Sequence, residues 1–195
     1  DRHQRHLGNV QPFAQQVDPD QHVELAQPQV ANDLYPLDGI DLCGAAATLA
    51  SKLVVRIEAP HEADPFWISR LADDGRQYGI PGESFEPDRW LTDGDQVTVG
   101  DLALDVIHCP GHTPGHVVFH HSPSRLAVVG DVLFQGSIGR TDFPMGNHAD
   151  LIDAITRKLW PLGNDTAFIP GHGPMSTFGH ERASNPFVGD HAMAG

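Results

Sequence analysis

The chain has 195 residues, and its 26 acidic residues against 12 basic ones give a formal net charge of −14 at neutral pH. This charge opposes binding to nucleic-acid phosphates and favours a small-molecule partner. No apolar stretch approaches the roughly 20 residues of a membrane span, so no membrane association is expected. The two cysteines require no disulfide and suit a reducing cytoplasm. We expect a single domain over residues 1–195.

The predicted elements begin only after an unusual amino-terminal segment. Seven of the ten glutamines lie in the first 29 residues, and residues 1–33 show almost no strand-like alternation. From there on, helices and strands are predicted in turn. In chain order we expect a helix at 45–52, a buried strand at 53–57, a helix at 65–72, strands at 96–99, 102–107, 117–119 and 126–129, a helix at 150–159 and a strand at 166–169.

Three short segments each follow an apolar run and carry a potential metal ligand: His112, Asp131 and His172. Imidazole and carboxylate groups are the ligands of zinc-type hydrolytic sites, and turns just past strands can direct them to one point. A glycine precedes each of the three, where a tight turn favours a residue without a β-carbon. With 13 histidines in the chain, one such segment would mean little. Three in order indicate a metal site, although Asp131 alone would also suit a turn or a helix cap.

The order of these motifs resembles the metallo-β-lactamase superfamily. The relevant runs are Gly-His-Thr-Pro-Gly-His at 111–116, Gly-Asp-Val-Leu-Phe at 130–134 and Ile-Pro-Gly-His-Gly-Pro at 169–174. Residues 136–144 and 181–187 are similar to the short glyoxalase II-like hydrolases within that superfamily. The resemblance implies an α/β fold, a four-layer αββα sandwich, with one or two metal ions at one edge. The implied cofactor is zinc, with iron or manganese as alternatives.

The resemblance also implies site residues and a reaction. His112, Asp131 and His172 would bind metal, with Asp131 bridging two ions, and Arg140 matches a substrate-binding cation, although it also suits a plain surface position. Similar enzymes hydrolyse thioesters of the S-lactoylglutathione kind through a metal-bound hydroxide. The longer members bind glutathione with an additional helical domain, which we do not expect after residue 187 here, so the identity of the thioester substrate stays open.

One family signature is missing. The pattern His-x-His-x-Asp-His should precede a Gly-Ala-Ala, which here stands at residues 44–46. Aligned on that glycine, the three histidines fall on Leu37, Gly39 and Leu42, and only the aspartate is kept, as Asp41. Asp41 is therefore predicted both as a metal ligand and as the group that orients the hydroxide or accepts its proton. An ordinary turn residue is the alternative reading of Asp41.

Two accounts of this missing signature compete. Either the metal site is weakened, or residues 1–43 as written do not represent the molecule. A weakened site would suit a non-catalytic binding or regulatory member of the same fold, and this is the alternative to a metal-dependent thioester hydrolase. Metal analysis of the purified protein separates the two functions.

Overall fold

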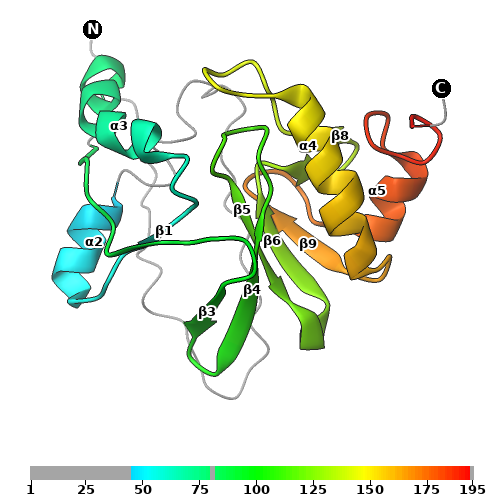
Figure 1. Ribbon diagram of the computed structural model, residues 1–195, viewed down its shortest axis with the longest axis horizontal. Coiled ribbons are helices and arrows are strands. Elements are labelled where there is room, and N and C mark those ends of the chain that lie inside the picture. The colour runs from blue at the N-terminus through cyan, green and yellow to red at the C-terminus, as the bar shows by residue number, and fades with distance from the viewer. Residues whose placement is uncertain (1–44, 80–81, 194–195) are drawn as a thin grey trace, which may run out of the picture.

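The computed structural model describes residues 45–79 and 82–193, and these contain helices and one main β-sheet (Figure 1). The helices are α2 (Ala46–Leu53), α3 (Pro65–Tyr78), α4 (His148–Ala154) and α5 (Phe178–Ser184), and α4 continues into a π-helical segment η3 (Ile155–Leu159) and a 3₁₀ turn η4 (Trp160–Leu162). None of the helices within the described ranges has the length and apolarity needed to cross a bilayer.

The main sheet has six strands in the order β10-β9-β6-β5-β4-β3. The strands are β3 (Gln96–Val99), β4 (Leu102–His108), β5 (Val117–His121), β6 (Leu126–Gly130), β9 (Ala167–Pro170) and β10 (Ser176–Thr177). Two smaller pairs accompany it: β1 (Glu58–Ala59) with β2 (Arg89–Trp90), and β7 (Leu133–Phe134) with β8 (Ser137–Ile138). A 3₁₀ turn, η2 (Ser122–Ser124), connects β5 to β6.

The strand directions bring three strand ends to one edge of the sheet. β4 and β6 each pair antiparallel with β5, so these two run in the same direction. β9 pairs parallel with β6, with Gly130 opposite Pro170 at the end of the pair. The carboxyl ends of β4, β6 and β9 therefore share an edge, and the loops that follow them contain the three predicted metal ligands.

The main core lies between this sheet and the helices α4 and α5, which cover one of its faces (Figure 1). β6 shows the alternation clearly, since Ala127 and Val129 are fully buried against the helices while Val128 between them is 41% exposed. Leu151 of α4 and Phe178 of α5 are fully buried in the same cluster. This packing fixes the strands whose ends carry the site.

The predicted hairpins 96–107 and 117–129, the strand at 166–169 and the helices at 45–52, 65–72 and 150–159 are all found, with shifted ends. The predicted buried strand at 53–57 is wrong. Helix α2 includes Leu53 and ends at Val54, which has a left-handed backbone (φ 55°) and a side chain that is 91% exposed. The run is apolar but does not alternate, and apolar runs of this length do not distinguish a strand from a helix end.

Candidate metal centre

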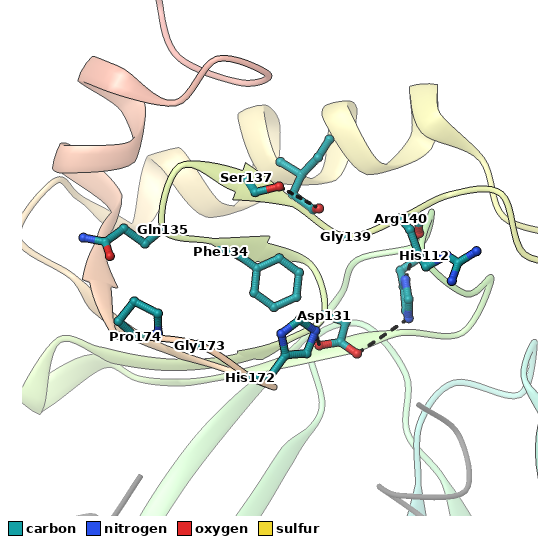
Figure 2. A pocket seen from close by; sticks show the side chains of 11 residues that line it. His112, Asp131, Phe134, Gln135, Ser137, Gly139, Arg140, His172, Gly173 and Pro174 are labelled. Atoms are coloured by element: carbon teal, nitrogen blue, oxygen red, sulfur yellow. Dashed lines mark hydrogen bonds and ion pairs between the residues drawn. The ribbon is translucent and has the colours of Figure 1, made fainter. Parts of the chain in front are cut away.

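Asp131 lies at the centre of the site, directly after β6. Its side chain is buried, and its Oδ1 has no hydrogen-bond partner among the described residues. His172 Nε2 lies 3.6 Å from Oδ1, and His112 Nε2 lies 3.8 Å from Oδ2. Figure 2 shows the two imidazoles on either side of the carboxylate. The structure therefore brings together the three residues that the sequence singled out.

The glycines before these residues allow the close packing. Gly130 has a left-handed backbone (φ 51°), and a β-carbon there would lie 2.7 Å from His116 Nε2. A β-carbon at Gly171 would collide with Asp131 Oδ1. The turn argument made from the sequence therefore applies at Gly130, whereas at Gly171 the requirement is space beside the carboxylate.

The tautomer of His112 is set by the main chain. Its Nδ1 lies 2.8 Å from the carbonyl oxygen of Arg140, and a carbonyl can only accept, so Nδ1 carries the proton. In the neutral ring the Nε2 lone pair is then available on the side that faces Asp131. Metal-binding histidines are typically oriented by such a hydrogen bond to their second ring nitrogen.

His116 holds the backbone of Asp131 at the same centre. Its Nε2 accepts a hydrogen bond of 3.2 Å from the backbone amide of Asp131. Burial lowers the pKa of His116 to about 3, so the ring stays neutral and keeps its acceptor nitrogen at working pH. The loop that contains both histidines is also tied down by Asp64, a buried carboxylate that accepts from Thr113 Oγ1 and Gly115 N, each at 2.6 Å. No sequence motif indicated this role of Asp64.

The side chains of His112, Asp131 and His172 are of the types that bind divalent cations. Two imidazole nitrogens and a carboxylate are ligands that zinc, iron and manganese sites use, and the buried, unpartnered Oδ1 lacks the hydrogen bond that such an atom normally has. Within residues 45–79 and 82–193, however, no three such side chains converge as a complete metal site. The imidazoles of His112 and His172 face different oxygens of Asp131. The two imidazole nitrogens and the carboxylate therefore do not point to one shared position. Asp41 and positions 37, 39 and 42 lie outside these ranges.

A cavity of about 320 Å³ opens beside this centre (Figure 2). Phe134 and Ile138 give its wall an apolar part, and Phe134 stacks on the ring of His172 at 4.4 Å between centroids. His172 is 58% exposed, in contrast to the buried His112. Arg140 also lines the cavity. An opening of this kind, with an apolar wall opposite polar and charged side chains, suits a small organic substrate.

The two sides of this cavity are connected by Glu181, a fully buried residue of α5. Its carboxylate accepts from Gly136 N at 2.7 Å, from Ser176 Oγ at 2.5 Å and from Asn185 Nδ2 at 2.9 Å. Asn185 Nδ2 also donates to the carbonyl oxygen of Ser137. The motif at 181–187, noted in the sequence only as a family resemblance, thus anchors the β7–β8 segment and the strand that follows His172.

Replacing Glu181 by glutamine is expected to destabilise the protein by about 1–3 kcal/mol, because the amide cannot accept from all three buried donors. Urea unfolding followed by circular dichroism measures the change. Glu62→Gln, at an exposed glutamate, serves as the matched control and should leave the free energy of unfolding unchanged. Equal effects of the two substitutions would mean that the buried network contributes nothing.

Comparison with known proteins identifies the family. The sequence profile of the metallo-beta-lactamase superfamily matches residues 40–172. The chain belongs to this superfamily. Hydroxyacylglutathione hydrolase GloC of Haemophilus influenzae is 42% identical over 151 residues, which cover 76% of this chain and 71% of that protein. Two further curated relatives, from Aquifex aeolicus and Mycobacterium tuberculosis, are spanned over only 50% and 62% of their lengths.

Solved structures agree with this assignment. A di-iron-bound form of the protein TTHA1623 aligns with a TM-score of 0.66 and 34% identity, covering 74% of this chain and 70% of that one. The B3 metallo-beta-lactamase BLEG-1 aligns with the same TM-score and coverage at 35% identity. The mixed α/β fold class predicted from the sequence is confirmed as that of the metallo-β-lactamases. The family and its relatives support a metal-dependent hydrolase acting on a small molecule.

Proposed function

We propose that this protein is a metal-dependent hydrolase of small anionic thioesters, of which S-lactoylglutathione is the first to test. The observation that carries the proposal is the buried carboxylate of Asp131 with an imidazole facing each of its oxygens. This arrangement supports His112, Asp131 and His172 as residues that would hold metal, and Asp41 remains a predicted further ligand. The likeness to the hydroxyacylglutathione hydrolase supports the substrate class.

A bound zinc, iron or manganese ion would supply Lewis acidity and a nucleophile at neutral pH. The residues of this chain hold the predicted metal ligands in place. His112 is held by the Arg140 carbonyl, and the Asp131 amide is held by His116. The apolar wall at Phe134 would exclude water from the acyl group of the substrate. A thiolate is a good leaving group, so no strong general acid is needed.

Exhaustive chelation is expected to abolish hydrolysis of S-lactoylglutathione, and addition of zinc, iron(II) or manganese(II) should restore it. The assay follows loss of the thioester absorbance, with metal content measured on the same samples. Activity that persists in protein shown to be metal-free would contradict the proposal. The alternative is a non-catalytic binding or regulatory protein, which the missing histidines at positions 37, 39 and 42 favour. Substrate binding without turnover, in protein that retains little metal, would support that alternative.

Arg140→Ala is expected to raise KM for S-lactoylglutathione about tenfold with little change in kcat, because it removes binding that ground and transition states share. The alanine keeps the backbone carbonyl that orients His112, so the variant tests the side chain alone. Arg125→Ala is the matched control, since Arg125 is an exposed arginine paired with Asp165 outside the cavity lining. A kcat loss without a KM change would assign Arg140 a different role.

A further inference from the structure

The guanidinium of Arg140 already binds a carboxylate of the chain itself. Its Nε donates to Asp142 Oδ1 and its Nη2 to Asp142 Oδ2, each at 2.7 Å, in a bidentate pair. Hydrogen bonds from Arg140 lower the pKa of Asp142 to about 2, so the carboxylate is charged at every working pH. The edge of the guanidinium that best matches a substrate carboxylate is therefore occupied by Asp142.

A second contact holds the same guanidinium without using that edge. Its central carbon lies over the ring of Phe143, 4.3 Å from the centroid. Phe143 is itself packed edge-on against His112 (5.3 Å) and Trp67 (5.8 Å). The cation–π contact thus holds Arg140 independently of Asp142. Arg140 lines the cavity beside the predicted metal ligand His112 (Figure 2).

The pair with Asp142 is also accessible to a competitor. The side chain of Arg140 is 38% exposed and that of Asp142 is 69% exposed. Exposed ion pairs contribute little to stability, because water competes for both charges and two side chains must be ordered. An incoming carboxylate can take over both donated hydrogen bonds, while Asp142 gains solvation.

We propose that Asp142 is a specificity-determining residue that occupies Arg140 until the carboxylate of an anionic substrate displaces it. This inference rests on the proposed function, in which Arg140 receives the anionic part of the substrate. The competing carboxylate weakens binding of every anionic ligand that needs Arg140, and it penalises monodentate anions most, because they replace the bidentate pair poorly. A neutral ligand does not use Arg140 and is not affected. Phe143 keeps the guanidinium in place during the exchange.

The decisive variant is Asp142→Asn, which removes the competing charge and keeps the size of the side chain. KM for S-lactoylglutathione should fall about two- to fivefold, a change of the size expected for one exposed ion pair. KM for N-acetylcysteamine acetyl thioester, which is neutral, should not change. Asp165→Asn is the matched control, because Asp165 is an exposed aspartate paired with Arg125, and its loss alters the net charge equally. A gain in affinity cannot arise from damage to the fold.

Two further measurements separate this inference from the proposed function. Asp142→Asn in an Arg140→Ala background should have no effect on KM, since the residue acts through Arg140. Calorimetry of metal-free protein with S-methylglutathione, a thioether that is not hydrolysed, should show the same affinity gain without turnover. An unchanged or weakened affinity in Asp142→Asn overturns the inference whether or not the enzyme is active. Absence of thioester hydrolysis with a retained gain in binding overturns the proposed function alone.

Discussion

Asp131→Asn is expected to lower kcat for thioester hydrolysis by at least about 10³-fold. The carboxylate is the group that both imidazoles face, and its replacement by an amide removes the charge that would attract and bridge metal ions. Metal ions contribute several kcal/mol of transition-state stabilisation in hydrolases, and each 1.36 kcal/mol corresponds to a factor of ten. Loss of the metal therefore predicts a loss of at least this size.

The same variant should not unfold. In the metal-free protein Asp131 is a buried carboxylate with an unpartnered oxygen, an arrangement that costs stability. The thermal midpoint of metal-free Asp131→Asn should therefore equal or exceed that of the metal-free wild type. Added zinc should raise the midpoint of the wild type and leave that of the variant unchanged, because only a protein that binds the ion gains stability from it. A variant that keeps its metal and turns over normally would remove Asp131 from the site.

The three residues of this centre were predictable because their signal is local. Each follows an apolar strand and a glycine, and such strand ends can be read from a single sequence. Their convergence also requires that β4, β6 and β9 run in the same direction, whereas the two predicted hairpins pair only β3 with β4 and β5 with β6. The antiparallel pairing of β4 with β5 and the parallel pairing of β9 with β6 both needed the structure.

The groups that orient the centre were not predictable, since their contacts join distant parts of the chain. The carbonyl that fixes His112 lies 28 residues away, at Arg140, and a main-chain acceptor leaves no mark on the sequence. Glu181 reaches Gly136 across 45 residues, and Asp64 reaches Gly115 across 51. Such pairs depend on tertiary packing, which periodicity does not report. Asp142 beside Arg140 is close in sequence, but charged neighbours on a surface loop are too common to indicate a role.

The mistaken strand at 53–57 has a similar origin. The run of apolar residues from Leu53 to Val55 suits a strand by composition, and the left-handed backbone of Val54 that ends α2 is rare for a β-branched residue. The prediction therefore followed propensity where the chain adopts an exceptional conformation. Val54 and Val55 remain largely exposed, so burial did not decide this segment either.

Introducing histidine at the three signature positions, as Leu37→His, Gly39→His and Leu42→His together, is expected to raise metal content and hydrolase activity in parallel. The described residues offer three donors that do not converge as a complete site, and structural and catalytic metal sites need three or four protein ligands for each tightly held ion. The unaltered chain should hold at most about one ion weakly, and the altered chain should approach two. Atomic absorption after gel filtration measures the ratio, and thioester turnover is assayed on the same fractions.

The matched control replaces the same three residues by glutamine, which is polar and of similar size but binds these ions far less strongly than imidazole. It should change neither metal content nor activity. Adding Asp131→Asn to the histidine variant should abolish the gain, because the restored donors would share their ions with the central carboxylate. Stoichiometric binding of two ions by protein verified to have the unaltered sequence would show that other residues complete the site. In that case the missing histidines would have no bearing on catalysis, and the ligands would have to be sought among the remaining histidine and carboxylate side chains of the chain.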